Sequence, residues 1–227
     1  MVWTGLPSRC QVCGRWPAQP VCAPCQARFA ATVARCPTCA LRTPAGTAAC
    51  ARCLRQPLPL RHCWAVVDYA YPWHTVVARF KFQRQPGWAR ALAALAMRHT
   101  DIAQALLVAD HVLPVPLNPA RLAERGYNQA WELVKALRPT HPLPDGLLRL
   151  DHTSEQIGQD RASRQRQMHN AFAVTPAHLP VLAGRHLLVV DDVMTTGATL
   201  AAAADTLLRA GAASVSGLCF ARTPIDD

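Results

Sequence analysis

The sequence predicts an α/β domain preceded by a small metal-binding module. Eight of the ten cysteines fall into four C-x2-C pairs before residue 54. After residue 61, short apolar runs alternate with helix-forming stretches, and one run, 187–190, passes directly into two aspartates and a Thr/Gly turn. With 227 residues and 51% hydrophobic content, the chain can bury one core plus a small accessory module. The predicted domains are residues 1–60 and 61–227.

The cysteine pairs predict zinc. Four pairs supply eight thiolates, enough for two tetrahedral Zn2+ sites without an open position, and closed sites are structural. A module this short cannot build a sufficient core, so metal binding would supply much of its folding free energy. Redox dithiols are the alternative, but they rarely come in fours. Sequential pairing is simplest, and an interleaved cross-brace also fits the spacing. The predicted ligands are Cys10, Cys13, Cys22, Cys25, Cys36, Cys39, Cys50 and Cys53.

The other cysteines and the histidines offer no comparable pattern. Cys63 and Cys219 lie in apolar surroundings, which predicts buried small hydrophobes rather than nucleophiles. The nine histidines show no ligand spacing and are interpreted as ordinary surface or core residues.

Positive charge is concentrated in the cysteine module. Of the formal net charge of +10, residues 1–61 contribute +8, from eight arginines and no acids. Eight thiolates and two Zn2+ ions would reduce that +8 to +4. Trp3, Trp16 and Phe29 could stack on bases, so nucleic-acid contact is one hypothesis. The other is compositional, because 22 arginines against two lysines is typical of a GC-rich genome.

The remaining elements follow in order. Residues 55–60 are a proline-stiffened linker. A strand is expected at 64–71, a helix from Trp73, a turn at 85–87 and an alanine-rich helix to His99. A second buried strand at 110–116 ends in prolines, which cannot continue a ladder.

The second half continues the alternation. Residues 121–129 form a basic lead into a helix with apolar spacing at 131–137, followed by a proline-rich loop at 139–146. Residues 152–170 are polar nearly all round, which predicts an exposed helix or a mobile loop. Strands are expected at 187–190 and 215–220, with a helix at 199–210 closed by Gly211 between them.

The turn after residue 190 is the candidate ligand site. Backbone N–H groups at the mouth of the following helix favour a phosphate, and Gly197 lets the backbone come close. Asp191 and Asp192, at the end of the strand, can accept hydrogen bonds from ribose hydroxyls or hold a hydrated Mg2+. A plain capped helix is the alternative. The predicted phosphate-binding residues are Thr195, Thr196, Gly197, Ala198 and Thr199.

The segment 187–200, LLVVDDVMTTGATL, resembles the phosphoribosyl-pyrophosphate (PRPP) signature of type I phosphoribosyltransferases. Together with the cysteine pairs, RFKF at 79–82, PVPLNPARLAERGYNQ at 114–129 and QIGQDRASRQRQMHNAF at 156–172, it resembles the ComF/ComFC competence family over essentially the whole chain. In the polar segment Gln156, Arg161, Arg164 and Phe172 match the family pattern. Gln159, Gln167 and Asn170 replace its usual Leu, Asn and Gly.

The resemblance implies a double zinc ribbon followed by a type I phosphoribosyltransferase fold, a twisted and mainly parallel sheet with flanking helices. It implies PRPP bound with Mg2+, with Asp191 and Asp192 facing the ribose as the catalytic pair if transfer occurs. Helpers in the family include a DNA-translocating helicase and recombination proteins.

PRPP also needs cations. Lys81 is the first candidate for its pyrophosphate, although it could be a solvated charge at a strand edge. Arg121 and Arg125, as arginines before a helix, could close over the pyrophosphate as a lid. Arg161 and Arg164, spaced i, i+3, would share a helix face for a partner or nucleic acid.

Two functions remain open at this point. One is a PRPP-binding factor in uptake or processing of single-stranded DNA, and the other is an active phosphoribosyltransferase with an unidentified base or amine as acceptor. No window approaches the roughly 20 apolar residues of a membrane span, and the first residues do not resemble a signal peptide. A cytoplasmic protein is expected.

Overall fold

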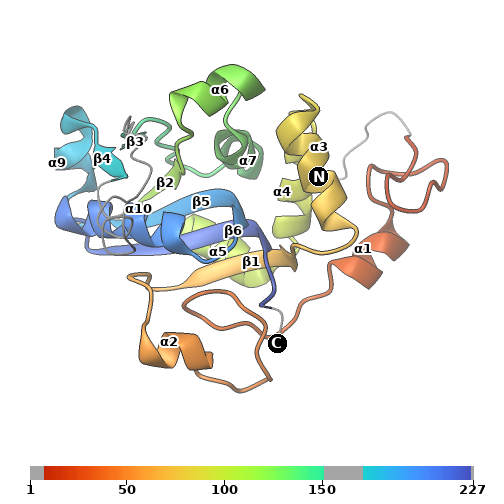
Figure 1. Cartoon of the computed structure of the whole chain (residues 1–227), viewed down its shortest axis with the longest axis horizontal. Helices are drawn as coiled ribbons and strands as arrows, with labels where there is room; N and C mark the ends of the chain where they lie inside the picture. Colours follow the sequence, from red (N-terminus) through yellow and green to blue (C-terminus); the bar gives the residue numbers. More distant parts are fainter. Residues whose placement is uncertain (1–7, 151–170, 226–227) are drawn as a thin grey trace, which may run out of the picture.

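A four-stranded parallel sheet organises the larger part of the molecule (Figure 1). The computed structural model describes residues 8–150 and 171–225. The strands lie in the order β1–β6–β5–β2, with bounds Cys63–Asp68 (β1), His111–Pro114 (β2), His186–Met194 (β5) and Ser214–Arg222 (β6). All three pairings are parallel, so the carboxyl ends of the strands meet at one edge. The predicted α/β class is confirmed.

Each side of the sheet buries its own apolar side chains, because successive strand residues point to opposite faces. Leu188 and Leu218 pack on one side with α3, α4, α5 and α7, whereas Leu187 and Val215 pack on the other with α10. The bounds of these helices are Trp73–Phe82 (α3), Trp88–Ala96 (α4), Thr100–Val108 (α5), Gln129–Leu137 (α7) and Ala198–Arg209 (α10).

Two helical regions differ from the sequence prediction. The helix predicted to reach His99 ends at Ala96, and α5 begins at Thr100 without an intervening Gly or Pro to mark the boundary. The predicted basic lead contains a helix of its own, α6 (Pro119–Arg125). Asn118 caps α6 by accepting the Ala120 N–H at 2.8 Å, and Gly126 ends it at φ +80°. The local Asn, Pro and Gly signals for α6 were present in the sequence.

A small antiparallel pair, β3 (Leu147–Arg149) and β4 (Phe172–Val174), lies beside the parallel sheet. The pair was not predicted, because each strand has only three residues and the two are far apart in sequence. The exposed helix or loop expected at 152–170 lies outside the described residues. A 3-10 turn, η1 (Pro176–His178), and a short helix, α9 (Leu179–Leu182), lead from β4 to β5.

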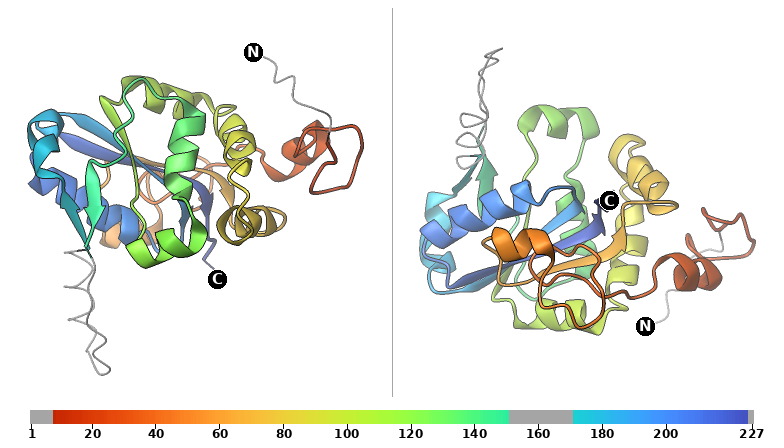
Figure 2. Two further views of the ribbon diagram at one scale, coloured as in Figure 1. Left: turned by 90° about the horizontal axis from the view of Figure 1, so that it is seen from above. Right: turned by 60° about the horizontal axis from the view of Figure 1, so that its bottom comes forward.

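The cysteine-containing segments occupy two separate places. Figures 1 and 2 show α1 (Ala23–Phe29) beside α3 and α4, and α2 (Ala51–Arg55) beneath the sheet. Residues 8–30, here called the first cysteine segment, pack with the α3 and α4 side of the core. The segment around α2, residues 34–60, is here called the second cysteine segment and shares its core with the opposite face of the sheet. The two cysteine segments are therefore attached to different faces of the same sheet.

Candidate functional site

The two aspartates of the candidate site lie within β5, which continues four residues beyond the predicted end at Val190. Asp192 is only 7% exposed, and its Oδ1 atom is 2.9 Å from the Nζ atom of Lys81. Lys81 lies in the last turn of α3 rather than at a strand edge. The structure thus pairs Lys81, the predicted pyrophosphate ligand, with one of the predicted ribose or magnesium ligands.

Asp191 has a different environment from its neighbour. Its Oδ1 atom accepts the backbone N–H of Asp192 at 2.8 Å. Burial, followed by the nearby Asp192 carboxylate, raises the pKa of Asp191 to about 7, although the Lys81 charge acts in the opposite direction. The pair therefore combines a carboxylate held by Lys81 with a carboxyl group that gains or loses its proton near neutral pH.

The loop 195–199, here called the phosphate loop, leads into α10. Gly197 is the N-cap of α10, with φ +86°, a conformation that favours glycine. A Cβ at this position would lie 2.5 Å from Met194 Cε and 2.9 Å from Leu58 Cδ1. These atoms are the ends of flexible side chains that can shift, so the backbone shape is what favours glycine here. Thr196 Oγ1 accepts the Ala198 N–H at 3.3 Å. This places the positive end of a 12-residue helix at the loop, which follows the aspartate pair in the chain.

Arg125 is packed against the end of α3. Its Cζ atom is 5.1 Å from the centre of the Phe82 ring, and its Nη1 atom donates to Gln129 Oε1 at 2.9 Å. Its Nε atom is buried without a hydrogen-bond partner in the described part of the chain. Tyr127, in the turn after α6, donates to the Phe80 carbonyl and joins the same elements.

Arg121 is exposed on α6. Arg121 and Arg125 precede α7, as predicted, but they also belong to a helix of their own, α6. Arg121 lies in the first turn of α6, and Arg125 lies in its last turn, where a positive charge complements the helix dipole. The unfavourable position at a helix N-terminus, expected of both arginines, therefore applies to Arg121 alone. Arg161 and Arg164 lie outside the described residues.

Two arginines near the site were not predicted. Arg149, on β3, acts on Asp191 by lowering its pKa, and its Cζ atom is 5.4 Å from the centre of the Phe172 ring. Arg222, at the end of β6, donates to the carbonyls of Met194 and Thr195 beside the phosphate loop. The only sequence signal for Arg222 was a charge ending an apolar run, and nothing in the sequence pointed to its partners.

The eight paired cysteines form two groups by sequential pairing, and the cross-brace alternative is wrong. Within each group all four sulfur atoms lie within 4.8 Å of one another. The first cysteine group comprises Cys10, Cys13, Cys22 and Cys25, and the second cysteine group comprises Cys36, Cys39, Cys50 and Cys53.

Both groups have the chemistry of a zinc site. The sulfurs of Cys13 and Cys22 are 3.6 Å apart, and those of Cys39 and Cys50 are 3.5 Å apart. A tetrahedral site with Zn–S bonds of about 2.3 Å places its sulfurs about 3.8 Å apart. Four soft thiolates without an oxygen ligand favour Zn2+ in a closed, structural role.

Backbone N–H donors lower the pKa of the first cysteine in each group. Burial on its own would raise the pKa of Cys10, but N–H groups directed at its sulfur, led by that of Cys22, lower the pKa to about 6. Cys36 shows the same balance, with the Cys50 N–H as the leading donor and a pKa of about 6. These sulfurs are therefore readily available as thiolate ligands.

Cys63 and Cys219 are buried, as predicted. Burial raises the pKa of the Cys63 thiol, and it raises that of Cys219 to about 12. Both thiols therefore stay protonated and unreactive at neutral pH.

The aromatic residues considered for base stacking differ in exposure. Trp16 is 59% exposed, whereas Phe29 packs edge-on against Tyr71, with ring centres 5.6 Å apart. Trp3 lies outside the described residues. Of the two aromatic side chains that can be compared, Trp16 is the one open to a ligand.

Within residues 8–150 and 171–225, no helix combines the length and the apolar character needed to cross a bilayer.

Comparisons with known proteins gave one matching domain model and several similar proteins. Residues 128–226 match the family model described as "Phosphoribosyl transferase domain". The "DNA utilization protein YhgH" of Escherichia coli O157:H7 is 34% identical over 96% of this chain and 98% of its own length. The "Competence protein F" of Haemophilus influenzae is 35% identical over 66% of this chain and 68% of its own. The "Competence protein ComFC" of Bacillus subtilis is 30% identical, with coverage of 91% and 86%.

Proposed function

The chain belongs to the ComF/ComFC family of competence-related proteins with a phosphoribosyltransferase domain, and from this premise we propose that it binds PRPP and acts in the handling of single-stranded DNA. The names of the relatives refer to competence and DNA utilization, which supports a role near DNA uptake. Catalysis is not required by this proposal, since a fold can keep a ligand site without the reaction.

The observation that carries the proposal is the arrangement of β5, the phosphate loop and α10. The 5-phosphate of PRPP would bind the backbone and hydroxyl groups of residues 195–199 at the positive end of α10. The ribose hydroxyls would donate to Asp191 and Asp192. A carboxylate pair also supplies the oxygen ligands that Mg2+ prefers, and bound Mg2+ would offset the charge of the pyrophosphate.

Lys81 has a defined role in this proposal. Without ligand it balances the charge of the buried Asp192 carboxylate at 2.9 Å. With PRPP bound, its flexible ammonium group would turn to the pyrophosphate oxygens and release Asp192 for the ribose. Arg125, which is anchored beside Phe82, would add a second positive charge near the end of α3.

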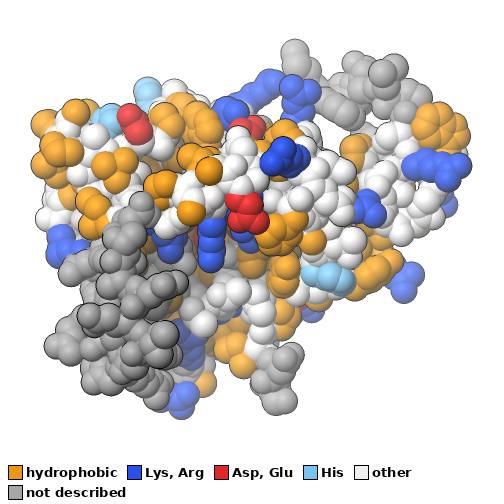
Figure 3. All heavy atoms as spheres, turned by 45° about the horizontal axis from the view of Figure 1, so that its top comes forward, with side chains coloured by type: hydrophobic (Ala, Val, Ile, Leu, Met, Phe, Trp, Pro, Cys, Tyr) orange, Lys and Arg blue, Asp and Glu red, His pale blue; other side chains and the backbone are white. Residues whose placement is uncertain are grey.

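For single-stranded DNA we propose the first cysteine segment as the contact surface. Arg9, Arg15 and Arg28 are exposed on it, and Trp16 is 59% exposed. Figure 3 shows basic side chains spread over one face of the molecule instead of gathered in a single patch. The combination of arginines with an exposed aromatic ring is what favours this segment, because single strands bind through phosphate contacts and base stacking.

The test is calorimetric titration of the zinc-loaded protein with PRPP in Mg2+. The wild type should bind, and Asp191→Asn/Asp192→Asn should weaken binding by at least about tenfold, because the amides neither accept as strongly from the ribose nor hold Mg2+. A control, Asp101→Asn/Asp145→Asn, removes the same charge from exposed positions and should bind as the wild type does. A folded wild type that does not bind PRPP would refute the proposal.

The second candidate is phosphoribosyl transfer to a base or amine with release of pyrophosphate. It is favoured by the match to the transferase family and by Asp191, whose pKa of about 7 suits proton transfer at neutral pH. Pyrophosphate release across a panel of purines, pyrimidines and amines separates the two candidates: a binding factor yields none, and an enzyme releases one equivalent per turnover.

The cytoplasmic location and the contacts with a DNA-translocating helicase and recombination proteins remain proposals of the same kind. Co-purification from a competent host in the presence and absence of PRPP would test the partners.

A further inference from the structure

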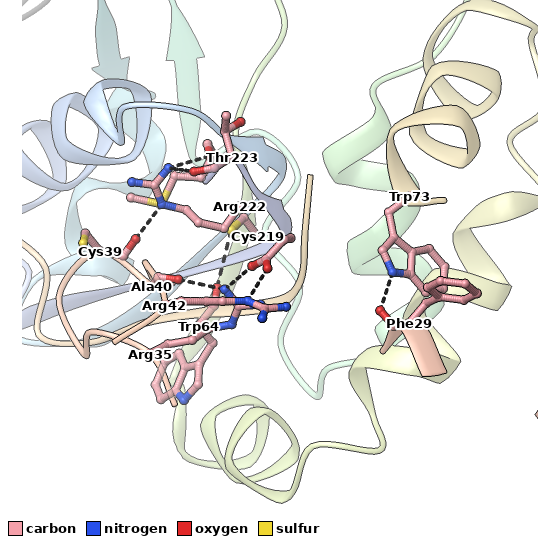
Figure 4. Close-up of polar contacts among 12 residues, drawn as sticks. Phe29, Arg35, Cys39, Ala40, Arg42, Trp64, Trp73, Cys219, Arg222 and Thr223 are labelled. Atoms are coloured by element: carbon pink, nitrogen blue, oxygen red, sulfur yellow. Dashed lines mark hydrogen bonds and ion pairs between the residues drawn. The ribbon is translucent and has the colours of Figure 1, made fainter. Parts of the chain in front are cut away.

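Arg222 is a deeply buried charged residue whose role the proposed function does not use. It is 1% exposed and lies at the carboxyl end of β6. Its guanidinium makes four hydrogen bonds, and every acceptor is a backbone carbonyl. Figure 4 shows the side chain reaching towards Cys39 on one side and lying against Thr223 on the other.

These bonds join two distant parts of the chain. The Nε atom donates to the carbonyl of Cys39, a member of the second cysteine group, at 2.7 Å. The Nη1 atom donates to the carbonyl of Met194 at 3.1 Å and to that of Thr195, the first residue of the phosphate loop. A single rigid, planar group therefore connects a metal-ligand residue to the loop.

An apolar contact also joins the second cysteine segment to the phosphate loop. The ideal Cβ position of Gly197 is only 2.9 Å from Leu58 Cδ1, so this linker side chain lies directly against the loop. Leu58 also packs against the core that contains the second cysteine group. The phosphate loop is thus held by the second cysteine segment through both polar and apolar packing.

The charge of Arg222 needs a counter-charge. A guanidinium keeps its proton at any accessible pH, and a buried charge without compensation is strongly destabilising. Carbonyl dipoles supply part of the compensation. Four thiolates around Zn2+ carry a formal charge of about −2. In the second cysteine group this charge lies close to Arg222, because the Nε atom of Arg222 donates to the carbonyl of Cys39, one of the four cysteines. Loss of the metal ends the fixed arrangement of the four sulfurs around Cys39 and so disturbs this compensation.

The first cysteine group has a different attachment. Trp73 Nε1 donates to the Phe29 carbonyl at 2.6 Å, and Arg79 Nη1 donates to Gln11 Oε1 at 2.6 Å. Both hydrogen bonds lead to α3, on the other side of the sheet from Cys39. The first group therefore serves as an internal control for the second.

We infer that Arg222 is a positioning residue that makes PRPP affinity depend on zinc occupancy of the second cysteine group. This inference rests on the proposed binding of PRPP at the phosphate loop. With zinc bound, Arg222 holds the carbonyls of Met194 and Thr195 and fixes the start of the loop. Loss of that zinc releases the loop and weakens PRPP binding, whereas loss of zinc from the first group does not.

Arg222→Met tests the polar connection, and Arg35→Met is the matched control. Arg35 is also nearly buried and lies within the second cysteine segment, where it donates to the Ala40 carbonyl at 3.1 Å, but its other partner is Asp68 at 2.7 Å and not the loop. Both variants should melt at lower temperature. Only Arg222→Met should raise the Kd for PRPP, by about tenfold or more, and Arg222→Lys should recover part of the affinity.

Coupling is reciprocal, so the wild type provides a test that does not depend on a variant folding. Alkylation by N-ethylmaleimide, followed residue by residue with mass spectrometry, reports the opening of each cysteine group. Saturating PRPP should slow the labelling of Cys50 and Cys53 by about fivefold or more. The labelling of Cys22 and Cys25 should change little.

The outcomes separate the two proposals. If calorimetry shows no PRPP binding, the proposed function fails and takes this inference with it. If PRPP binds, but it slows labelling of both groups equally or of neither, the coupling is overturned and PRPP binding stands. Equal PRPP affinity of folded Arg222→Met and Arg35→Met would likewise overturn the coupling, because it would show that Arg222 contributes to stability only.

Discussion

Asp191 and Asp192 are adjacent in sequence and have different roles in the folded protein. Asp192 is held by Lys81, while Asp191 is left with a pKa raised to about 7 by burial and by its neighbour. A folded-state pKa above the usual value means that the folded protein binds the proton more tightly than the unfolded chain does. Stability from this source is present at acid pH and is lost as the pH rises through about 7.

Asp191→Asn should therefore stabilise the ligand-free protein more at pH 8 than at pH 6. The amide oxygen can still accept the Asp192 N–H, and the variant has no buried charge to develop as the pH rises. The measurement is the difference in Tm between variant and wild type at pH 6, 7 and 8, with zinc bound and PRPP absent.

Asp101→Asn on the exposed face of α5 is the control, and its Tm difference should stay level across the same range. A level difference for Asp191→Asn as well would show that the carboxyl group does not titrate in this window.

At the residue scale, the groups that could be located from sequence are those whose chemistry is local. The aspartate pair, the phosphate loop and the cysteines could be found because neighbouring residues define each motif. Lys81 was chosen for its charge alone, and its pairing with Asp192 spans more than 100 residues. Arg222 could not be predicted, because its acceptors are backbone carbonyls, which every residue carries whatever its side chain.

At the scale of elements, the two cysteine segments look equivalent in sequence and differ in packing. Cys25 lies in α1 and Cys53 in α2, and both are buried. The second segment shares a core with Leu200 and Val215 of the α/β domain, and the Cys63 N–H donates to the Pro37 carbonyl at 2.7 Å. The spacing of the cysteines carried no information about this difference.

Cys25→Ser and Cys53→Ser should each reduce the zinc content from two ions to one. Cys53→Ser should also lower the free energy of unfolding of the α/β domain by about 3 kcal/mol or more, because its segment is hydrogen-bonded directly to strands of the sheet, at Cys63 and at Arg222. Cys25→Ser should affect mainly the first cysteine segment and lower the main transition less, because the hydrogen bonds of that segment described above lead to α3 and not to a strand. Atomic emission for zinc and thermal melting by circular dichroism check both expectations.

A main transition that falls equally in both variants would contradict the difference in packing.

The helices also differ in how well their ends could be predicted from sequence. The helix α6 had clear terminal signals, whereas the break between α4 and α5 had none and depends on how both helices pack on the sheet.

At the scale of the whole molecule, the formal net charge of +10 is not evidence for a DNA site by itself, because an Arg-rich composition alone can produce it. The position of the exposed arginines is more informative. A triple variant of the first cysteine segment, Arg9→Gln/Arg15→Gln/Arg28→Gln, should weaken binding of single-stranded DNA. The slope of log K against log salt should fall by about 2, or about 0.7 for each phosphate that is no longer neutralised. Filter binding of oligo-dT over a salt series measures it.

Arg61→Gln/Arg138→Gln/Arg185→Gln removes the same charge from exposed positions outside that segment. This control should leave the slope close to that of the wild type. An equal fall in slope for the two triple variants would mean that DNA senses only the overall charge.

The connection of Arg222 to Cys39 also affects how such a chain can change during evolution. Gene fusion could replace the first cysteine segment if the new segment kept a few interactions with α3, such as the acceptor for Trp73. Replacing residues 34–60 would need compensating substitutions in β6 and α10 at the same time, because Arg222 and Leu200 pack with that segment. Lineages without the second cysteine group should therefore also differ at Arg222, while the first group can disappear or be exchanged on its own.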